Sequence, residues 1–594
     1  MPSDADRAEP SPRARRRALL VGAFRSIRPE GDDGPFGSQG GFVDTLAPSP
    51  YSLATGYLKA YAEADPEVAA RWSVDRLDLS QPLDIDDDHE EVELGLADVD
   101  RLLAHAPDLI AFSAYCWNEA TFREVARELK RRAPDVRVAI GGRATDGDVA
   151  AMLRESPAID LVVVGEGEVP LRELLRHDLD PKGIAGVRYA RDGVLVRGAP
   201  RASLLDLDEI PSPFAAGILA PPKNGMMLEL GRGCLHACGY CTWNADKRLR
   251  FFGPARVEAE LRLARARGHR HVTFNDSALN YSTAHLVSAI DAIRRADPDG
   301  EVRFTYNVRH DCVDDAQLAA LARLPTHTML VGVESFTGRA MLESDRALPD
   351  RDSLRRALSA LGRAARPPVA SIILGMPGDD AESFIQTLEE LLSWTEPRGD
   401  EPPTIAAVLV SLLQVYPGSK LWRRREELGL KVAARGVPYL LESPDFPARD
   451  LAAAKAYLVR RMTQLPDKLK AAEAIVLMEA RGGMHPWLAR SHVEALLSPW
   501  SLGARRGGWT LTRIASARDT GSAALVRFRR EGGGEARVRL SLRDRARPSE
   551  LQTHCYSLAI EPLDAPLPER ARVELTALVR EALIAGERRA VGAR

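Results

Sequence analysis

The stretch that decides the fold reads LELGRGCLHACGYCTW and covers residues 228–243. It holds three of the six cysteines of the chain, spaced Cys234-x3-Cys238-x2-Cys241. Soft thiolates are the ligands of iron–sulfur clusters, and three of them on one tight loop can hold a 4Fe–4S cluster with one iron open to an outside ligand. Zinc is the alternative. Because zinc prefers four protein ligands, distant residues such as His310 and Cys312 would then have to complete the set.

The residues before this stretch alternate short apolar runs with amphipathic segments. This alternation is typical of a doubly wound parallel sheet, which binds ligands outside the carboxyl ends of its strands. Residues 1–16 are predicted to be a disordered tail, residues 17–182 a Rossmann-like domain, and residues 183–225 a linker with a small β-patch. The predicted strands of the first domain are 18–24, 74–79, 108–114, 136–141 and 160–165.

A second series of strands and helices begins directly before the cysteines. Six repeats over residues 226–428 predict a partial (β/α)6 barrel, in which function gathers at the carboxyl ends of the strands. Its predicted strands are 226–230, 271–275, 303–307, 328–333, 370–374 and 407–414. Residues 429–594 predict an α+β domain, with helices at 448–465 and 469–481 followed by antiparallel strands at 509–514, 523–530 and 535–542. The fold class is therefore α/β, with an α+β domain at the end.

Composition limits the classes of function. The 594 residues are 45% hydrophobic and 28% charged, which is typical of globular proteins, and the net charge is −3. This balance gives no electrostatic reason to expect nucleic acid or an anionic membrane as a partner. No apolar stretch approaches the roughly 20 residues that a membrane helix needs, and the start lacks the apolar core of a secretory signal. We therefore expect a cytoplasmic protein without a membrane span.

The cysteine motif, with Tyr240 before its last cysteine, resembles that of the radical S-adenosylmethionine (radical SAM) superfamily. The resemblance implies that S-adenosylmethionine chelates the open iron, and that an electron from the cluster cleaves its sulfonium to give a 5′-deoxyadenosyl radical. The resemblance continues in FNDSALN, VGVESF, SIILGMPG and LQVYPGS, at the ends of four later strands. The S-adenosylmethionine contacts that it implies are Tyr240, Asn275, Asp276, Glu334, Leu374 and Gln414.

Two residues near the end of the third barrel strand are the predicted catalytic residues. Tyr306 is a candidate proton or hydrogen donor, and Arg309 is a candidate to hold a carboxylate. Each candidate has a structural alternative. Tyr306 could pack in the core, Arg309 could lie at the surface, Glu334 could pair with an arginine, and Asn275 or Asp276 could cap the next segment.

The amino-terminal half resembles the cobalamin-binding class of this superfamily. The segments SAYCWN, GGR and GEGE match the ends of the third, fourth and fifth strands of that class, and IPSPF matches its linker into the barrel. A dinucleotide is disfavoured because no G-x-G-x-x-G follows the first strand. The chain also lacks the Asp-x-His-x-x-Gly motif that gives many other cobalamin proteins an imidazole ligand. The implied cobalamin contacts are Ser113, Tyr115, Trp117, Asn118, Gly141, Gly142, Gly165, Glu166, Gly167 and Glu168.

The resemblance implies an enzyme like the class B radical SAM methyltransferases. Its cofactors would be a 4Fe–4S cluster, S-adenosylmethionine and cobalamin, and the chain would supply binding and orientation. A methyl group would pass from S-adenosylmethionine, by way of methylcobalamin, to an unactivated or aromatic carbon of a natural-product or peptide substrate. The expected partners are that small-molecule or peptide substrate and an electron donor such as flavodoxin or ferredoxin.

Three alternatives stay open at this point. Methylation of an aromatic carbon by polar chemistry would release no 5′-deoxyadenosine with the product. A cobalamin-binding radical SAM enzyme that rearranges or cyclises its substrate would give no net methylation. A regulatory protein that senses cobalamin or light is disfavoured by the intact cysteine triplet. The other cysteines, Cys116, Cys312 and Cys555, are expected to be structural.

Overall fold

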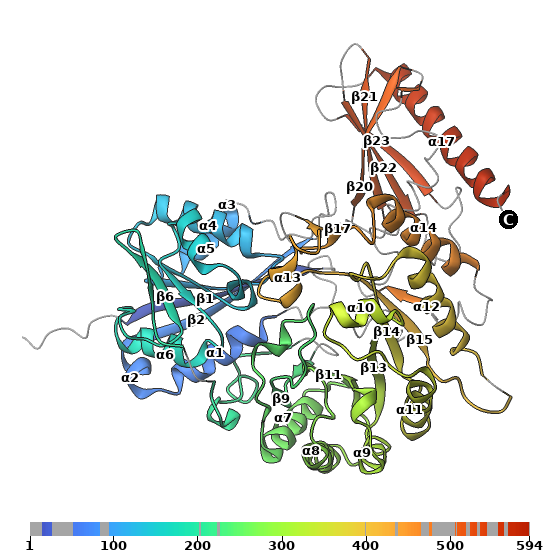
Figure 1. Ribbon diagram of the computed structural model, residues 1–594. Helices are drawn as coiled ribbons and strands as arrows, with labels where there is room; N and C mark the ends of the chain where they lie inside the picture. The colour runs from blue at the N-terminus through green and yellow to red at the C-terminus, as the bar shows by residue number, and fades with distance from the viewer. Residues whose placement is uncertain are drawn as a thin grey trace, which may run out of the picture.

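The computed structural model describes residues 15–26, 51–82, 94, 96–200, 203–221, 226–397, 399–433, 437–464, 475–477, 505–506, 508–517, 523–531, 535–542, 556–562 and 568–592. Three sheets of five or more strands organise these residues. Figure 1 shows the first sheet with its helices in blue to cyan, the barrel beside it in green to yellow, and a smaller sheet in orange and red. None of the described helices combines the length and the apolar composition that crossing a membrane requires.

The first sheet has the strand order β2-β1-β3-β4-β5-β6-β7. Strands β1 to β5 are parallel, as the sequence predicts, whereas β6 and β7 are antiparallel. The β-patch that the sequence assigned to a linker thus continues this sheet, because the tight turn at Asp192 and Gly193, both with positive φ, folds β7 back on β6. The strands are β1 (Arg16–Ser26), β2 (Trp72–Pro82), β3 (Leu109–Ser113), β4 (Arg137–Gly141), β5 (Leu161–Val163), β6 (Val187–Arg191) and β7 (Val194–Arg197).

Helices cover both faces of this sheet, which explains its apolar strands. Alternate residues of a strand point to opposite faces. On β1, Leu19 and Val21 pack with helices α3, α4 and α5, whereas Ala18 and Leu20 pack with α1, α2 and α6. The helices are α1 (Leu53–Glu63), α2 (Pro66–Arg71), α3 (Leu96–Ala104), α4 (Glu119–Arg132), α5 (Val149–Glu155) and α6 (Glu168–Arg176).

The second sheet is the barrel sheet, with the order β18-β15-β14-β13-β12-β11-β8 and every neighbouring pair parallel. Its six predicted strands are present, and a seventh, β18, pairs with β15 at the edge. The helix predicted at 469–481 is wrong at β18, since periodicity cannot separate a short apolar run in a strand from one in a helix. The strands are β8 (Met226–Leu228), β11 (His271–Phe274), β12 (Arg303–Asn307), β13 (Thr326–Glu334), β14 (Val369–Leu374), β15 (Ala407–Leu412) and β18 (Ile475–Leu477).

Polar caps fix where the barrel helices begin. Ser282, Asp314, Asp350 and Asp380 each accept a hydrogen bond from a backbone amide in the first turn of the helix that follows. The barrel helices are α7 (Pro254–Ala266), α8 (Thr283–Ala296), α9 (Asp315–Leu321), α10 (Gly338–Glu343), α11 (Arg351–Ala364), α12 (Ala381–Ser393) and α13 (Lys420–Arg424). The amphipathic pattern of residues 283–296 predicts a helix with these bounds, and α8 confirms both ends.

The third sheet is antiparallel, in the order β19-β20-β21-β22-β23. The short ladder of β16 (Lys431–Val432) and β17 (Leu440–Glu442) lies between the barrel and this sheet in the chain. Trp509 and Leu511 of β20 and Leu575 and Val579 of α17 are buried in the same core as the barrel residues. The remaining elements are α14 (Ala448–Gln464), β19 (Arg505–Arg506), β20 (Trp509–Ala517), β21 (Ala523–Arg530), β22 (Glu535–Leu542), β23 (Tyr556–Pro562) and α17 (Glu569–Gly592).

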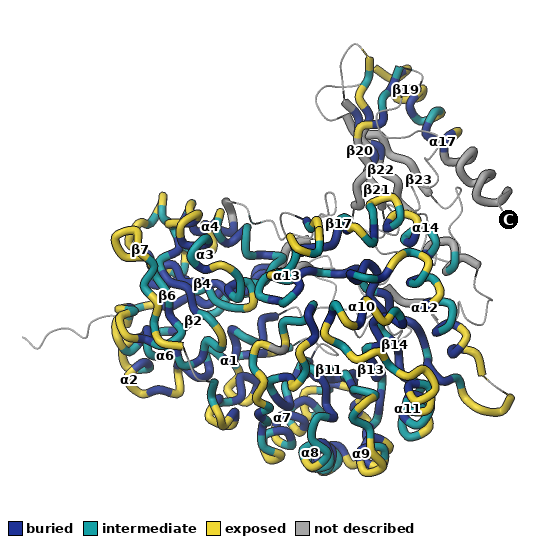
Figure 2. Tube along the Cα trace, viewed as in Figure 1, coloured by how far each residue is buried: buried dark blue, intermediate teal, exposed yellow. Residues whose placement is uncertain are grey.

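The first domain and the barrel share a core. Tyr51, which lies two residues before α1, and Tyr57, which lies within it, are buried in the same cluster as Phe214 and the first barrel strand. The Tyr51 hydroxyl accepts a hydrogen bond from the Met227 amide at 2.9 Å, and the Tyr57 ring stacks on Phe252 with centroids 6.0 Å apart. Figure 2 shows this continuous buried zone running from α1 into the barrel strands. The two domains are therefore packed together along one side.

Candidate functional site

The cysteine loop is closed at its neck by a two-stranded hairpin. Strand β9 (Gly231–Arg232) pairs antiparallel with β10 (Arg250–Phe251), and the three cysteines lie in the loop between them. The Cys234 amide donates to the Asp246 carbonyl at 3.0 Å. Gly233 has a φ of +103°, and a Cβ there would lie 2.1 Å from the Arg248 carbonyl oxygen. Only glycine fits at this crossing of the loop.

The environment of the cysteines suits a metal cluster. Cys234 and Cys238 are buried, Cys241 is half-buried, and none of them forms a disulfide. Burial, with smaller contributions from the neighbouring Cys238 and Cys234, raises the pKa of the Cys241 thiol to about 11. Three thiolates this close together need a cationic partner, which iron supplies. The donor set therefore fits a 4Fe–4S cluster, in which each cysteine reaches a different iron.

No three His, Cys, Asp or Glu side chains in the described part of the chain are arranged to hold a single metal ion. The residues that the zinc alternative would add lie on the short helix η5 (His310–Cys312). The Cys312 thiol donates to the Asp311 carboxylate at 3.7 Å, and burial lowers the pKa of His310 to about 4.

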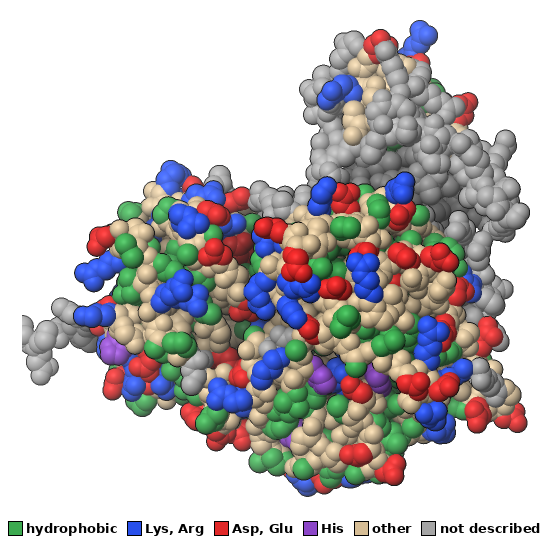
Figure 3. Space-filling model, in the orientation of Figure 1, with side chains coloured by type: hydrophobic (Ala, Val, Ile, Leu, Met, Phe, Trp, Pro, Cys, Tyr) green, Lys and Arg blue, Asp and Glu red, His purple; other side chains and the backbone are tan. Residues whose placement is uncertain are grey.

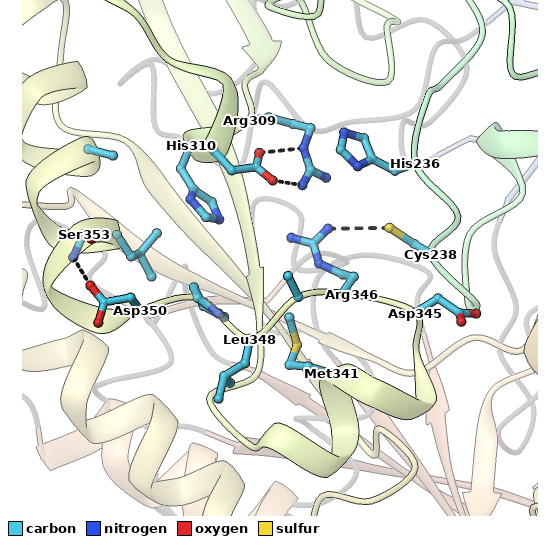
Figure 4. A pocket seen from close by; sticks show the side chains of 15 residues that line it. His236, Cys238, Arg309, His310, Met341, Asp345, Arg346, Leu348, Asp350 and Ser353 are labelled. Atoms are coloured by element: carbon cyan, nitrogen blue, oxygen red, sulfur yellow. Dashed lines mark hydrogen bonds and ion pairs between the residues drawn. The ribbon is translucent and has the colours of Figure 1, made fainter.

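A cavity of about 340 Å³ opens beside Cys238. Figure 4 shows Cys238 and His236 of the cysteine loop facing Arg309 and His310, which follow β12, and Arg346, which follows α10. Burial lowers the pKa of both histidines, so both are neutral near pH 7. The charged side chains that line the cavity are therefore two arginines and three aspartates, Arg309, Arg346, Asp311, Asp345 and Asp350.

Arg346 is the residue that sequence reasoning missed. Its guanidinium reaches Cys238 Sγ at 3.7 Å, the Tyr240 hydroxyl at 3.4 Å and the Gly332 carbonyl at 3.0 Å, and Glu334 lies 3.5 Å away. Burial by itself lowers the pKa of this guanidinium, but the surrounding Glu334, Tyr240 and Cys238 raise it. Arg346 therefore stays charged and ties the cysteine loop to the end of β13. It stands in a loop without a motif, so no sequence signal marks it.

Glu334 and Tyr240, both predicted to contact S-adenosylmethionine, are brought together by Arg346. Glu334 ends β13 with a φ of +69°, a strained value for a residue with a side chain. A Cβ on Gly332 would lie 2.3 Å from Glu334 Oε1, so glycine makes room for the carboxylate. The pairing of Glu334 with an arginine, given as its structural alternative, is present.

Asn275 and Asp276 follow β11 beside the first barrel strand. The Asp276 carboxylate accepts a hydrogen bond from the Leu230 amide at 3.0 Å, and burial raises its pKa to about 8. Asn275 is half-buried, and its backbone amide donates a hydrogen bond to the Leu228 carbonyl at 2.7 Å. Neither residue caps α8, because Ser282 does. Asp276 thus braces the segment that leads into the cysteine loop.

Leu374 and Gln414 lie at the ends of β14 and β15. The Leu374 side chain is fully buried, and its carbonyl accepts from the Leu413 amide at 2.9 Å. The S-adenosylmethionine contact predicted at Leu374 would therefore have to be made by its backbone rather than by its side chain. The Gln414 side chain accepts a hydrogen bond from the Tyr416 hydroxyl and is half-buried.

The structure contradicts the catalytic role predicted for Tyr306. The Tyr306 side chain is buried, and its hydroxyl bonds Thr326 Oγ1 at 2.7 Å. Because Thr326 begins β13, the hydroxyl lies toward the end of the barrel opposite the cysteines. Tyr306 therefore packs in the core. Arg309 pairs with the neighbouring Asp311 and lines the cavity, and its predicted catalytic role stays a prediction.

Aromatic rings mark the end of β3 in the first domain, where cobalamin contacts were predicted. The rings of Tyr115 and Trp117 are stacked, with their centroids 4.5 Å apart and their planes 3° from parallel. Both residues are half-buried. Ser113 is buried behind them and hydrogen-bonds the Tyr115 side chain. This stack offers a flat apolar wall to a large planar ligand.

The Asn118 side chain is bonded to backbone groups of the protein itself. Its amide group donates to the Ala23 carbonyl at 3.1 Å and its oxygen accepts from the Tyr115 amide at 2.7 Å. The side chain is 1% exposed. The prediction of a direct cobalamin contact through this side chain is wrong, since its bonds brace the Tyr115 loop against β1.

Glycines shape the next two strand ends. Gly142 has a φ of +108°, and a Cβ there would lie 2.5 Å from the Ala114 carbonyl oxygen, so the two loops touch through backbone. Gly141 packs against Val163. Gly165 has a φ of +82° and nothing within 4 Å of the Cβ position. Gly167 lies against Leu58. The stacked rings and this bare backbone at one edge fit the close approach of a corrin.

Glu166 and Glu168 point away from this role. The Glu168 carboxylate lies 2.8 Å from Arg232, and both oxygens of Glu166 bind Arg250, at 2.7 and 3.0 Å. Both arginines belong to the neck of the cysteine loop. The barrel thus engages both carboxylates, and the cobalamin contact predicted for these two residues stays a prediction. A sequence motif gives no sign of a partner 64 residues away.

The edges of the two domains meet at a second place. A Cβ on Gly418, which has a φ of +86°, would lie 2.5 Å from the Asp146 Cβ, and one on Gly147 would lie 3.3 Å from Pro417. Asp146 and Gly147 follow β4 of the first domain, and Pro417 and Gly418 follow β15 of the barrel. The carboxyl ends of both parallel sheets therefore face one another.

Comparison with known proteins identifies both domains. Residues 53–175 match the model of the B12 binding domain, and residues 228–391 match the model of the radical SAM superfamily. The first range contains the strand ends with the stacked rings and glycines, and the second contains the cysteine loop, Arg346 and Glu334.

Curated relatives carry related names. The chain is 31% identical over 224 residues to 2-(S-pantetheinyl)-carbapenam-3-carboxylate methyltransferase of Streptantibioticus cattleyicolor, covering 35% of this chain and 31% of that protein. It is 26% identical over 360 residues to the cobalamin-dependent radical SAM methyltransferase TokK of Streptomyces tokunonensis, covering 57% and 51%. The chain thus spans about half or less of the length of these two relatives.

A solved structure shares the fold. The radical S-adenosylmethionine methyltransferase TsrM of Kitasatospora setae, with cobalamin and a [4Fe-4S] cluster bound, superposes with a TM-score of 0.51 over 72% of this chain and 82% of that one, at 18% identity. The region that matches the B12 binding domain therefore precedes the region that matches the radical SAM superfamily, and the two regions hold the two facing strand edges.

Proposed function

We propose that this protein is a cobalamin-dependent radical SAM methyltransferase. It transfers a methyl group from S-adenosylmethionine, by way of cobalamin, to an unactivated or aromatic carbon of a natural-product or peptide substrate. The observation that carries the proposal is the meeting of the two strand edges, at Glu168 with Arg232 and at Asp146 with Gly418. A methyl carrier on one edge and a radical source on the other must share one substrate, so the edges must face each other.

Different residues of the chain would bind the different cofactors. Cys234, Cys238 and Cys241 would hold the cluster, and Arg346 would keep a positive charge beside Cys238. The cluster with S-adenosylmethionine supplies the methyl donor or the radical, and cobalamin carries the methyl group. Tyr115, Trp117 and the glycines that follow β4 and β5 would hold the corrin. The cavity beside Cys238 is the candidate place for S-adenosylmethionine and the adjoining part of the substrate.

The names of the relatives support methylation over other radical reactions. The two curated relatives described above are called methyltransferases, and the second is called cobalamin-dependent. Reductive cleavage of S-adenosylmethionine needs an electron, so a donor such as flavodoxin or ferredoxin is part of the proposal.

Anaerobic purification with added cobalamin tests the proposal. We expect about four iron, four sulfide and one cobalt per chain. Incubation with S-adenosylmethionine and a reductant should then form methylcobalamin, measured by chromatography, even without a substrate. Iron without cobalt after reconstitution would overturn the methylcobalamin route. With a substrate in hand, a product whose mass has not risen by one methylene would indicate rearrangement or cyclisation instead.

A further inference from the structure

The neck of the cysteine loop places two positive charges side by side. Arg232 and Arg250 are direct cross-strand partners in the β9–β10 ladder. Their side chains are only 13% and 4% exposed. Like charges opposite one another destabilise a strand pair, and the cost grows when solvent is excluded. The hairpin that closes the loop therefore depends on carboxylates around it.

Half of those carboxylates come from the other domain. The barrel itself provides Glu229, 3.1 Å from Arg232, and Asp246, 3.2 Å from Arg250. The B12-binding domain provides Glu168, 2.8 Å from Arg232, and Glu166, which takes Arg250 in a two-pronged contact. Bidentate arginine–carboxylate contacts fix direction as well as distance. The two acidic residues of GEGE thus form ion pairs with both strands of the neck.

These ion pairs connect the two strand edges that are predicted to hold the cofactors, and only a few residues separate the edges along this connection. Glu166 and Glu168 alternate with Gly165 and Gly167 at the end of β5, where the backbone is open to a ligand. Arg232 stands two residues before Cys234 in the sequence. A rigid link of a few residues therefore runs from the corrin side to the first cysteine.

We infer that Glu166 and Glu168 are positioning residues that hold the B12-binding edge at a fixed distance and angle from the cysteine loop. The inference rests on the proposed function for its purpose, namely to keep the methyl carrier aligned with the cluster. The domains remain docked without this contact, through Tyr51 with Met227 and through Tyr57 with Phe252. Loss of the ion pairs made by Glu166 and Glu168 should therefore misalign the two strand edges without separating the domains.

The test begins with the protein free of cofactors, by hydrogen exchange. Glu168→Gln and Glu166→Gln should each raise the exchange rate about tenfold or more in two segments together, residues 164–168 and 229–251, because a buried guanidinium loses its partner. Arg232→Gln should act on the same two segments. If Glu168 and Arg232 act through each other, the double variant Glu168→Gln/Arg232→Gln should be no worse than Arg232→Gln alone.

The matched control is an exposed pair on α7. Arg262 binds Glu258 at 2.6 Å, with the arginine side chain 59% exposed, and Glu258→Gln should leave both segments unchanged. Exchange that rises only in one domain, or effects of Glu168→Gln and Arg232→Gln that simply add, would overturn the inference. These outcomes do not depend on what reaction the protein catalyses.

The loaded enzyme gives the second readout. Pulsed electron paramagnetic resonance between the reduced cluster and Co(II) cobalamin should give one narrow distance in the wild type and a broadened distribution in Glu166→Gln/Glu168→Gln. Methyl transfer from the carrier to substrate should fall about tenfold or more in that variant, while cleavage of S-adenosylmethionine stays within about twofold. Equal losses in both steps, with an unchanged distance, would contradict a positioning role. A wild type that forms no methylcobalamin would instead defeat the proposed function and leave the exchange result standing.

Discussion

The two strand edges that face each other in this molecule differ in the kinds of residues that form them. The barrel edge is made of ionic and titrating side chains, in which Arg346 joins Cys238, Tyr240 and Glu334 within 3.7 Å. The edge of the first domain is made of stacked rings and glycine backbone, and the two acidic residues of its GEGE segment are turned toward the barrel. Figure 3 shows that Lys and Arg are interspersed with Asp and Glu on the face that it draws.

The difference follows from what each edge is proposed to hold. A cluster with a charged sulfonium ligand needs thiolates and balanced charges close by, because electrostatic contacts fall off with distance and strengthen away from water. A corrin is broad and mostly apolar, so shape and close backbone approach matter more. Side-chain deletion should therefore damage the barrel edge, whereas added methyl groups should damage the first edge.

The largest expected effect is at the cysteines. Cys234→Ala, Cys238→Ala or Cys241→Ala should remove the iron and abolish cleavage of S-adenosylmethionine, because a cluster needs each thiolate. Cobalt content should stay near one per chain, since the first edge holds no part of the cluster. Iron and cobalt analysis of the purified variants measures both. Cys312→Ala is the control and should keep its iron, and loss of iron there would show that Cys312 also holds the metal.

Arg346→Gln should have the next largest effect. It leaves the buried Glu334 carboxylate without its cation, and breaking a buried ion pair costs about 3–5 kcal/mol. We expect S-adenosylmethionine cleavage to fall about a hundredfold, measured as 5′-deoxyadenosine formed per minute. Arg346→Lys should recover little, because a lysine cannot reach Tyr240, Cys238 and Gly332 at once.

The control for Arg346 is an arginine of the same loop region. Arg351 pairs with Glu390 at 2.8 Å with its side chain 56% exposed, and Arg351→Gln should stay within about twofold of the wild type. Equal losses in Arg346→Gln and Arg351→Gln would mean that the barrel edge does not depend on the buried pair.

Gly142→Ala sharpens the comparison from the other edge. The added Cβ meets the Ala114 carbonyl at 2.5 Å and also faces a positive φ, so we expect a loss of about 2–3 kcal/mol of stability. Cobalamin affinity should fall about tenfold while iron content is unchanged. Gly183→Ala is matched, because Gly183 has a φ of +78° but open space around the Cβ position. A Gly142→Ala protein that binds cobalamin as tightly as Gly183→Ala would refute backbone contact at this edge.

The smallest effect is expected at Tyr306. Tyr306→Phe removes one buried hydrogen bond to Thr326 and should cost about 1 kcal/mol in denaturant unfolding. Cleavage of S-adenosylmethionine should not change, since the hydroxyl lies away from the cysteines. A tenfold loss of cleavage with unchanged stability would restore the catalytic role that the structure removes.

The sequence by itself determined the parts that depend on local pattern. The spacing of the three cysteines, the alternation of apolar strands with helices in both domains, and the span of α8 can all be read from residues close together in the chain. The glycines that follow β4 and β5 belong here too, because glycine at a strand end permits close approach of the backbone to a ligand.

Tertiary structure decided which polar side chains meet. Arg346 comes to Cys238 across 108 positions, and Arg232 comes to Glu168 across 64. Tyr306 points to the base of the barrel because its hydroxyl finds Thr326, and residues 475–477 become a strand because β15 offers an open edge. A buried charge or hydroxyl takes the partner that folding brings within about 3–4 Å, and no local pattern encodes that partner.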